Sequence, residues 1–113
     1  MERKMERADI AIIGTGPGGV SAALTAKVRN KNILLIGKKQ MSDKVSKAHQ
    51  IMNYPGLPAV TGADMAKAFE KQLAMMEIDI TDSRIGTVYA MGDYFAIQAG
   101  EEVLEAKSVI LAC

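Results

Sequence analysis

Two short, continuous apolar runs stand out in the first forty positions, with a glycine-rich stretch between them. The run at 8–13 (ADIAII) stops at Gly14, and the run at 33–36 (ILLI) stops at Gly37. Runs of this kind are typical of strands buried on both faces, as in a parallel sheet. Residues 18–29 carry apolar side chains at helical spacing, and 30–32 (NKN) is a turn sequence. The pattern predicts a strand–helix–strand unit of about the usual 30 residues.

A polar segment and then a second helical pattern follow. Residues 37–61 are polar and contain Pro55 and Pro58, which predicts a loop, and loops of this length inside a compact domain are commonly functional. The sequence at 61–64 (TGAD) has the pattern of a capping box. Apolar residues then repeat on one helical face: Met65, Phe69, Leu73 and Met76. We expect an amphipathic helix that begins after Thr61.

The last third of the chain has the two-residue alternation of strands. We predict a short strand at 78–80 and three alternating strands at 85–89, 94–99 and 103–105. Gly92-Asp93 and Gly100-Glu101 are turn sequences, so the three strands form an antiparallel meander. Residues 108–112 return to the pattern of a buried strand. The expected fold class is α/β, with a Rossmann-like parallel sheet and a small antiparallel β-meander.

Composition narrows the possible classes of protein. The chain has 113 residues, of which 49% are hydrophobic and 24% charged, as in one soluble globular domain. The single cysteine, Cys113, excludes an internal disulfide, and the single histidine excludes a multi-histidine metal site. Residues 1–7 (MERKMER) read as a charged N-terminal extension, and the apolar run behind them is too short for a signal or membrane helix. We expect a cytoplasmic setting and no membrane contact.

Charge is distributed unevenly along the chain. Residues 27–47 hold seven basic residues and one acid, whereas the chain from 48 onward holds four basic residues and nine acids. Such a basic stretch favours phosphates or an acidic partner protein. Nucleic acid is disfavoured as a partner, because no aromatic residue is interleaved with the lysines and no nucleic-acid-binding motif is present.

The strongest local motif is the glycine-rich sequence at 14–19 (GTGPGG), which fits G-x-G-x-x-G. Gly14 permits the tight turn from strand to helix, Gly16 lets the backbone approach a diphosphate, and Gly19 lets the helix pack closely on the strand. The diphosphate would lie at the positive end of the helix. Because the motif follows a predicted buried strand and opens a predicted helix, it predicts dinucleotide binding.

The identity of the dinucleotide depends on the end of the second strand. An acid at this position usually accepts hydrogen bonds from the adenosine ribose, but here Gly37 is followed by Lys38 and Lys39. One interpretation is that the lysines bind the 2′-phosphate of NADP. The other is that backbone groups of residues 37 and 38 hold the ribose and that the lysines are only exposed.

The whole order of motifs resembles the N-terminal FAD-binding part of the thioredoxin reductase family. The resemblance covers 8–19, the sequence 53–58 (NYPGLP), the helix after Gly62, the meander and 106–112. It implies FAD as cofactor, with Asn53 near the flavin, Ile85 beside the adenine, and the ribose at Gly37 and Lys38. It also implies cofactor contacts at the following positions: Gly14, Thr15, Gly16, Pro17, Gly18, Gly19, Lys44, Ala112 and Cys113. The last two take the place of the first residues of the family's Ala-Thr-Gly turn.

Within that family, 42–44 (SDK), 47–49 (KAH) and 53–56 (NYPG) are most similar to the clostridial ferredoxin-dependent flavin thioredoxin reductases. The resemblance implies a disulfide reductase that passes electrons from ferredoxin or NADPH through FAD to a cysteine disulfide. It also implies a thioredoxin-like partner, possible contact with ferredoxin, and a homodimer. The redox-active Cys-x-x-Cys pair of the family is absent, so we expect no catalytic residue in 8–113.

We therefore expect residues 8–113 to be the N-terminal part of a truncated FAD-binding domain that is inactive alone. Two alternatives stay open. The chain is a free-standing NAD(P)-binding Rossmann module, or it is an interaction domain whose basic face docks an acidic protein and whose glycine loop is vestigial.

Overall fold

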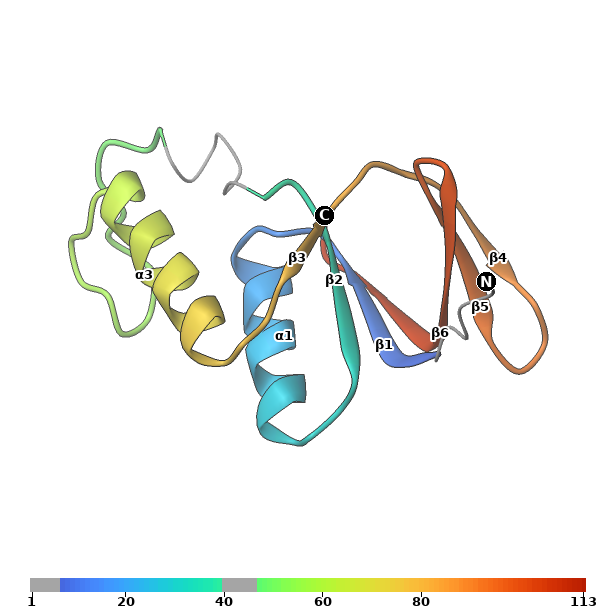
Figure 1. Ribbon diagram of the computed structural model, residues 1–113. Helices are drawn as coiled ribbons and strands as arrows, with labels where there is room; N and C mark the ends of the chain where they lie inside the picture. Colours follow the sequence, from blue (N-terminus) through green and yellow to red (C-terminus); the bar gives the residue numbers. More distant parts are fainter. Residues whose placement is uncertain (1–6, 40–46) are drawn as a thin grey trace.

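The computed structural model describes residues 7–39 and 47–113, in which two helices lie against one six-stranded sheet (Figure 1). The strands are β1 (Ala8–Ile13), β2 (Ile33–Gly37), β3 (Ile80–Asp82), β4 (Ile85–Ala90), β5 (Phe95–Ala99) and β6 (Glu102–Leu111), and the helices are α1 (Pro17–Val28) and α3 (Gly62–Met75). Their order in the sheet is β3-β2-β1-β6-β5-β4. The first four strands pair in parallel and the last three antiparallel. This confirms the predicted α/β class with a parallel sheet and a meander.

The continuous apolar runs of β1 and β2 arise because each strand is buried on both faces. Ile12 and Leu35 belong to a cluster packed beneath the helices, whereas Ala11 and Ile36 belong to a second cluster that includes residues of the meander. All four side chains are at most 1% exposed. Neighbouring residues of a strand point to opposite faces, so a strand covered on both faces has no position for a polar residue.

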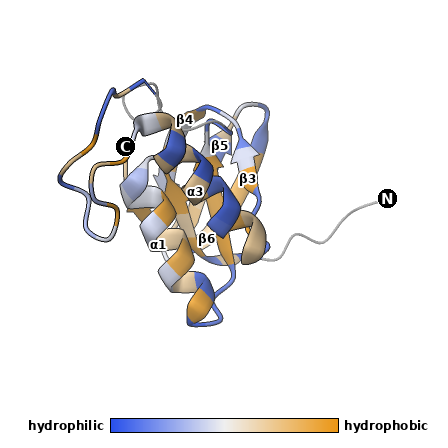
Figure 2. Cartoon of the chain, turned by 90° about the vertical axis from the view of Figure 1, so that its left-hand side faces the viewer, coloured by the Kyte–Doolittle hydropathy of each residue, from blue (hydrophilic) through white to orange (hydrophobic). Residues whose placement is uncertain are grey.

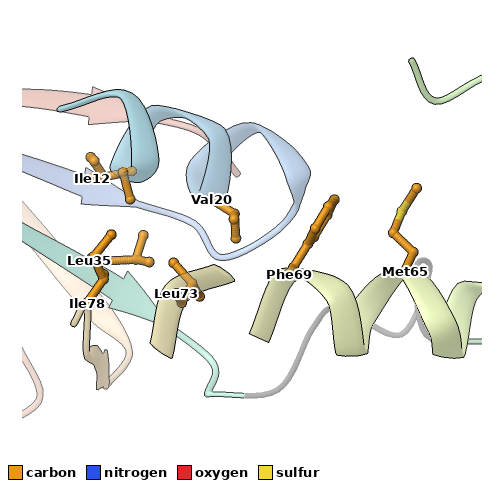
Figure 3. Close-up of a cluster of buried hydrophobic side chains, with 8 residues drawn as sticks. Ile12, Val20, Leu35, Met65, Phe69, Leu73 and Ile78 are labelled. Carbon is orange, nitrogen blue, oxygen red and sulfur yellow. The ribbon is translucent and has the colours of Figure 1, made fainter. Parts of the chain in front are cut away.

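The cluster beneath the helices, called the helix-side cluster below, takes three of its eight buried residues from α3. Met65, Phe69 and Leu73 of α3 pack with Val20 of α1 and with the sheet (Figure 3). The outer face of α3 is hydrophilic (Figure 2), which confirms the predicted amphipathic helix. Thr61 is the N-cap, and its Oγ1 accepts a hydrogen bond from the Asp64 N–H at 3.1 Å. Neither described helix has the length and apolar character needed to cross a bilayer.

The end of α3 corrects the predicted position of the next strand. Glu77 has a positive φ of 57°, and the Ile78 N–H donates to the Leu73 carbonyl while the Glu77 N–H donates to the Ala74 carbonyl. These two bonds form a Schellman motif, in which the residue after the left-handed position packs back on the helix. Ile78 is accordingly buried in the helix-side cluster. The strand predicted at 78–80 therefore begins two residues later, at 80.

β6 corrects a second prediction, because the two strands expected at 103–105 and 108–112 are one strand of ten residues. Its first half pairs antiparallel with β5 and its second half pairs parallel with β1. Ala106 takes part in both pairings, opposite Ala8 on one side and Phe95 on the other, and is fully buried. A small side chain at this junction lets one strand pass from one part of the sheet to the other without a turn.

The second half of β6 also differs from the buried strand that its apolar sequence predicts. Ile110 is 39% exposed and Leu111 is 71% exposed. In the described part of the chain, β6 beyond Ala106 has β1 as its strand partner on one edge only. The apolar residues at the end of β6, whose sequence is typical of a buried strand, thus lie at the surface.

The meander itself turns where the sequence predicts. Gly92 and Gly100 both have positive φ, at 96° and 64°, a conformation that glycine adopts without steric cost. Arg7, from the predicted N-terminal extension, contacts this hairpin: its Nε donates to a Glu105 carboxylate oxygen at 2.8 Å, and its guanidinium lies 3.6 Å above the Tyr94 ring centre.

Candidate cofactor-binding site

A cleft of about 600 Å³ opens at the carboxyl ends of the parallel strands. It lies where ligands bind in open α/β sheets, and its volume suits a small-molecule ligand. Residue 113 lies at this same end of the sheet (Figure 1). The lining residues come from the ends of β1, β2 and β3 and the start of β4: Ile13, Gly14, Ile36, Gly37, Lys38, Asp82, Ser83, Arg84, Ile85 and Cys113.

The three motif glycines, of which Gly14 lines this cleft, differ in their surroundings. A Cβ at Gly14 would collide with the Ala112 carbonyl oxygen, and a Cβ at Gly19 would collide with the Gly14 carbonyl oxygen. A Cβ at Gly16 would meet no atom within 4 Å. Packing of the protein therefore requires glycine at 14 and 19, whereas at 16 the backbone faces open space that a ligand can occupy.

The start of α1 is suited to an anion. Gly16 is the N-cap residue, Pro17 follows at the first helical position, no side chain caps the helix, and the first turn contains no acid. The free N–H groups of a first turn and the helix dipole together attract negative charge. The loop thus combines donors, a positive potential and an open approach at Gly16, which are the requirements for binding a diphosphate.

The end of the chain lies against this loop. The Ala112 N–H donates to the Ile13 carbonyl at 2.8 Å, and the Ala112 Cβ lies 3.7 Å from the place of a Cβ at Gly19. Cys113 is exposed and lines the cleft. Ala112 and Cys113 therefore lie beside the glycine motif, and their contact with a cofactor stays a prediction.

The end of β2 is closed by Thr15. This side chain is buried, and its Oγ1 donates to the Lys38 carbonyl at 2.8 Å. A Cβ at Gly37 would lie 2.8 Å from the Thr15 Cγ2, closer than real contacts allow. The absence of an acid at the end of β2 therefore has a steric cause: Thr15 fills the space that any side chain at residue 37 would need.

Three lining residues on the far side of the cleft were not anticipated from the sequence: Asp82, Ser83 and Arg84. The rule that carboxyl ends of neighbouring parallel strands meet could have found them. The sequence pattern does not reveal them because the predicted strand ends at 80, two residues before the end of β3. Ile85, the predicted neighbour of an adenine, does line the cleft.

The predicted flavin neighbour, Asn53, does not line this cleft. Asn53 is exposed in the loop between residue 47 and α3, and Lys44 lies outside the described residues. The loop is anchored by Tyr54, whose ring centre lies 5.6 Å from that of Phe69. The predicted contact of Asn53 with a flavin stays a prediction.

Within the described residues 27–39, the basic residues lie at both ends of β2. Lys27, Arg29 and Lys31 lie at the end of α1, before β2 begins, whereas Lys38 follows β2 at the cleft. The five residues of β2 separate these two groups by about 16 Å. Of the basic residues between 27 and 39, Lys38 lines the cleft and can contribute to ligand binding there.

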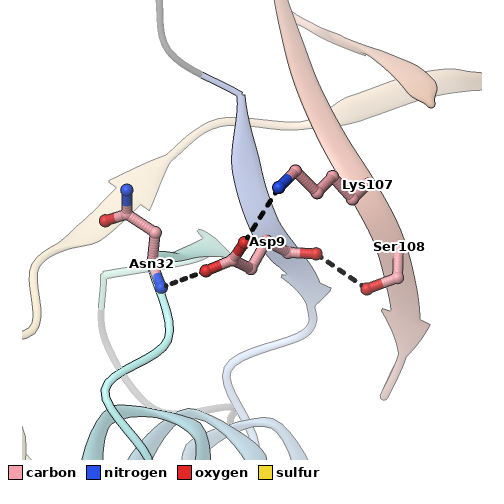
Figure 4. Close-up of polar contacts among 4 residues, drawn as sticks. All are labelled: Asp9, Asn32, Lys107 and Ser108. Atoms are coloured by element: carbon pink, nitrogen blue, oxygen red, sulfur yellow. Dashed lines mark hydrogen bonds and ion pairs between the residues drawn. The ribbon is translucent and has the colours of Figure 1, made fainter. Parts of the chain in front are cut away.

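A polar network at the opposite end of the sheet is structural (Figure 4). The Asp9 carboxylate accepts from the Asn32 N–H at 2.9 Å and lies 3.6 Å from the Lys107 Nζ, while the Ser108 Oγ donates to the Asp9 carbonyl at 2.8 Å. The hydrogen bond from Asn32, with the nearby Lys107 charge, lowers the pKa of Asp9 below its ordinary value. The network joins β1 to β6 and to the start of β2.

Comparison with known proteins places this geometry in context. The family model described as pyridine nucleotide-disulphide oxidoreductase matches residues 8–113. A crystal structure of a ferredoxin-flavin thioredoxin reductase from Clostridium acetobutylicum superposes with a TM-score of 0.91 at 44% sequence identity, over 95% of this chain and 37% of that chain.

Other proteins that are similar to this chain are also thioredoxin reductases. The thioredoxin reductase of Helicobacter pylori is 36% identical over 107 residues, which are 92% of this chain and 34% of that protein. The thioredoxin reductase structure from Streptococcus pyogenes has a TM-score of 0.85 at 28% identity, over 93% of this chain and 34% of that chain. The chain thus spans about one third of the length of these relatives.

Proposed function

The chain belongs to the pyridine nucleotide-disulphide oxidoreductase family, and from that premise we propose that it is the FAD-binding part of a thioredoxin-reductase-like flavoprotein. The observation that carries the proposal is the geometry of the glycine loop, which reaches the cleft at Gly14. Gly14 and Gly19 are held by protein packing, and Gly16 alone faces open space at the uncapped start of α1. This arrangement fits the diphosphate of a dinucleotide cofactor.

We propose which residues would hold each part of the adenosine diphosphate half of FAD. The loop at Gly16, at the start of α1, would hold the diphosphate, and Gly37 and Lys38 would hold the ribose. Ile85, across the cleft, would hold the adenine. When bound, FAD supplies a ring that takes up electrons and delivers them as a pair. The role of this chain is to hold and orient that cofactor.

The chain itself cannot supply the disulfide chemistry of the family. Reduction of a disulfide breaks one S–S bond and consumes two electrons and two protons, and a redox-active pair needs two cysteines, whereas Cys113 is single. We place the cysteine pair on a part of the protein outside residues 1–113. The electrons come from ferredoxin or NADPH, and the 44% identity to a ferredoxin-flavin thioredoxin reductase supports ferredoxin.

The partners follow from the same proposal. The disulfide substrate is a thioredoxin-like protein, the complete protein is a homodimer, and the setting is cytoplasmic. Because the basic residues between 27 and 39 lie at both ends of β2, an acidic ferredoxin would meet two separate basic groups in this part of the chain.

A second candidate is a free-standing NADP-binding module, favoured by the two cations of the cleft, Lys38 and Arg84, and by the missing acid at Gly37. The two candidates differ in ligand preference. Tight binding of NADPH that FAD does not compete away supports the second candidate and contradicts the first.

The proposal is tested by titrating the 113-residue chain with FAD and following flavin fluorescence. In Gly16→Val, the new side chain fits the free protein but occupies the space of the diphosphate. We expect a loss of at least about 1.4 kcal/mol of binding free energy, or tenfold in affinity. The urea midpoint of unfolding stays near that of the unmodified chain, since no protein atom opposes the valine.

The matched control is Ser21→Val, which adds similar bulk to an exposed position on α1 outside the loop. This variant retains FAD affinity. If Gly16→Val and Ser21→Val bind FAD equally, or if the unmodified chain shows no saturable binding of FAD or ADP, the glycine loop is not a dinucleotide site.

A further inference from the structure

The cleft lacks a ribose acceptor at the position where dinucleotide-binding folds usually have one. In such folds, a carboxylate near the end of β2 accepts hydrogen bonds from the ribose hydroxyls. Here Thr15 occupies the space beside Gly37, and its hydroxyl is already committed to the Lys38 carbonyl at 2.8 Å. A side chain at residue 37 would collide with Thr15, so among the described residues a carboxylate that holds the ribose has to come from another strand.

The parallel pairing of β2 and β3 supplies one. The register sets Gly37 directly beside Asp82, so the two residues end neighbouring strands at the same edge of the sheet. Both residues line the cleft. Asp82 is exposed, and no described residue forms a hydrogen bond or an ion pair with its carboxylate. Asp82 is thus an unengaged acceptor one strand away from the usual position.

The charges around Asp82 bear on which ligand fits. The cleft also contains Lys38 and Arg84, which attract phosphate, whereas the Asp82 carboxylate repels it. A carboxylate accepts two hydrogen bonds from a vicinal diol. A ribose with both hydroxyls free suits Asp82, and a 2′-phosphate would set two negative groups against each other.

We propose that Asp82 is the specificity-determining residue of this site, its carboxylate accepting hydrogen bonds from the 2′- and 3′-hydroxyls of an adenosine ribose that carries no 2′-phosphate. Asp82 thereby replaces the acid that Thr15 excludes from the end of β2. The inference rests on the proposed function and deepens it, because it assigns the ligand class to unphosphorylated adenosine dinucleotides.

The test compares ADP with 2′-deoxy-ADP by calorimetry on the 113-residue chain. Hydrogen bonds to a charged acceptor are strong, so we expect the unmodified chain to bind ADP about tenfold more tightly than 2′-deoxy-ADP. In Asp82→Ala this preference disappears, and ADP binds as weakly as 2′-deoxy-ADP does. Asp82→Asn keeps the shape of the side chain and one acceptor oxygen, so it retains an intermediate preference.

The matched control is Asp79→Asn, which removes an equal charge from an exposed position just before β3 and outside the cleft lining. It keeps the full preference for ADP. Adenosine 2′,5′-bisphosphate provides an independent measurement, since removal of the Asp82 charge should strengthen its binding relative to ADP.

The outcomes distinguish a failure of the proposed function from a failure of the role of Asp82 alone. If the unmodified chain binds neither ADP nor FAD, the proposed function fails and the role of Asp82 fails with it. If the unmodified chain binds ADP and Asp82→Ala keeps the same preference over 2′-deoxy-ADP, only the role of Asp82 is overturned. An unmodified chain that prefers the 2′-phosphorylated ligand also overturns it.

Discussion

At the scale of single residues, the sequence predicts the backbone conformation that a residue must adopt more readily than it predicts the residues from other strands that contact it. The turn at Gly14 and the close packing at Gly19 can be predicted because strand, turn and helix follow one another directly in the chain. The contact between Thr15 and Gly37 could not be predicted in this way, since it joins residues from two different strand ends. The same holds for Asp82, whose position beside Gly37 depends on the register of β3.

A pH prediction also belongs to this scale. The pKa of Asp9 is lowered in the folded protein by the Asn32 N–H and the Lys107 charge. Its ionised form therefore stabilises the fold, fully above the unfolded pKa of about 3.9, and this contribution is lost as the pH falls through the lower folded pKa. Urea unfolding at several pH values between about 6 and 3 should show a smaller acid-dependent fall of the midpoint for Asp9→Asn than for the unmodified chain.

Asp79→Asn serves as the comparison, because it removes an exposed carboxylate without touching the network of Figure 4. Its midpoint should follow that of the unmodified chain across the whole range. Identical acid dependence of Asp9→Asn and the unmodified chain would contradict the role given to this carboxylate.

At the scale of elements, the start of α3 was predicted and its end was not. The start depends on the local pattern at 61–64, whereas the end depends on a Schellman motif with glutamate, not glycine, at the left-handed position. Glu77 carries none of the usual marks of a helix end. For the same reason β3 was predicted too early, because the alternation at 78–80 hides the fact that Ile78 belongs to the helix-side cluster.

The cap of α3 gives the prediction at this scale. Thr61→Ala removes the side chain that accepts the Asp64 N–H, and loss of such a cap costs about 1 kcal/mol of the free energy of unfolding. Urea denaturation followed by circular dichroism measures the change. Thr61→Ser keeps the acceptor oxygen and should stay close to the unmodified chain. Equal stability of the alanine and serine variants would show that the cap contributes nothing.

At the scale of the whole molecule, the sheet is covered unevenly. The helices cover one face of β1 and β2, and the second buried cluster, which includes residues of the meander, covers the other. The second half of β6 keeps one edge without a strand partner in the described chain. The sequence predicted 108–112 as a buried strand from its apolar residues alone. The burial of a strand depends on the elements that pack against it, and the sequence of the strand alone does not reveal them.

This open edge predicts self-association of the 113-residue chain. An exposed apolar edge strand pairs readily with another chain, and a lysine on such an edge opposes the pairing. We expect sedimentation velocity to show concentration-dependent association that Leu111→Lys reduces. Met75→Lys removes a similarly exposed apolar side chain, 72% against 71% for Leu111, from a helix that has no open edge. Equal association of the two variants would assign the effect to general apolar exposure.

The long reach of β6 has a consequence for the order in which the protein folds. β1 lies inside the sheet, yet the hydrogen bond from Ser108 to Asp9 spans 99 positions of the chain. Strand pairings this distant in sequence form late in folding, because the entropy lost on closing a long loop must be overcome before the contacts can stabilise the pair. During synthesis, β1 and β2 can assemble early with α1, but β1 keeps a bare apolar edge until β6 has been made. We infer that this interval is the period in which the nascent chain is most dependent on protection from aggregation.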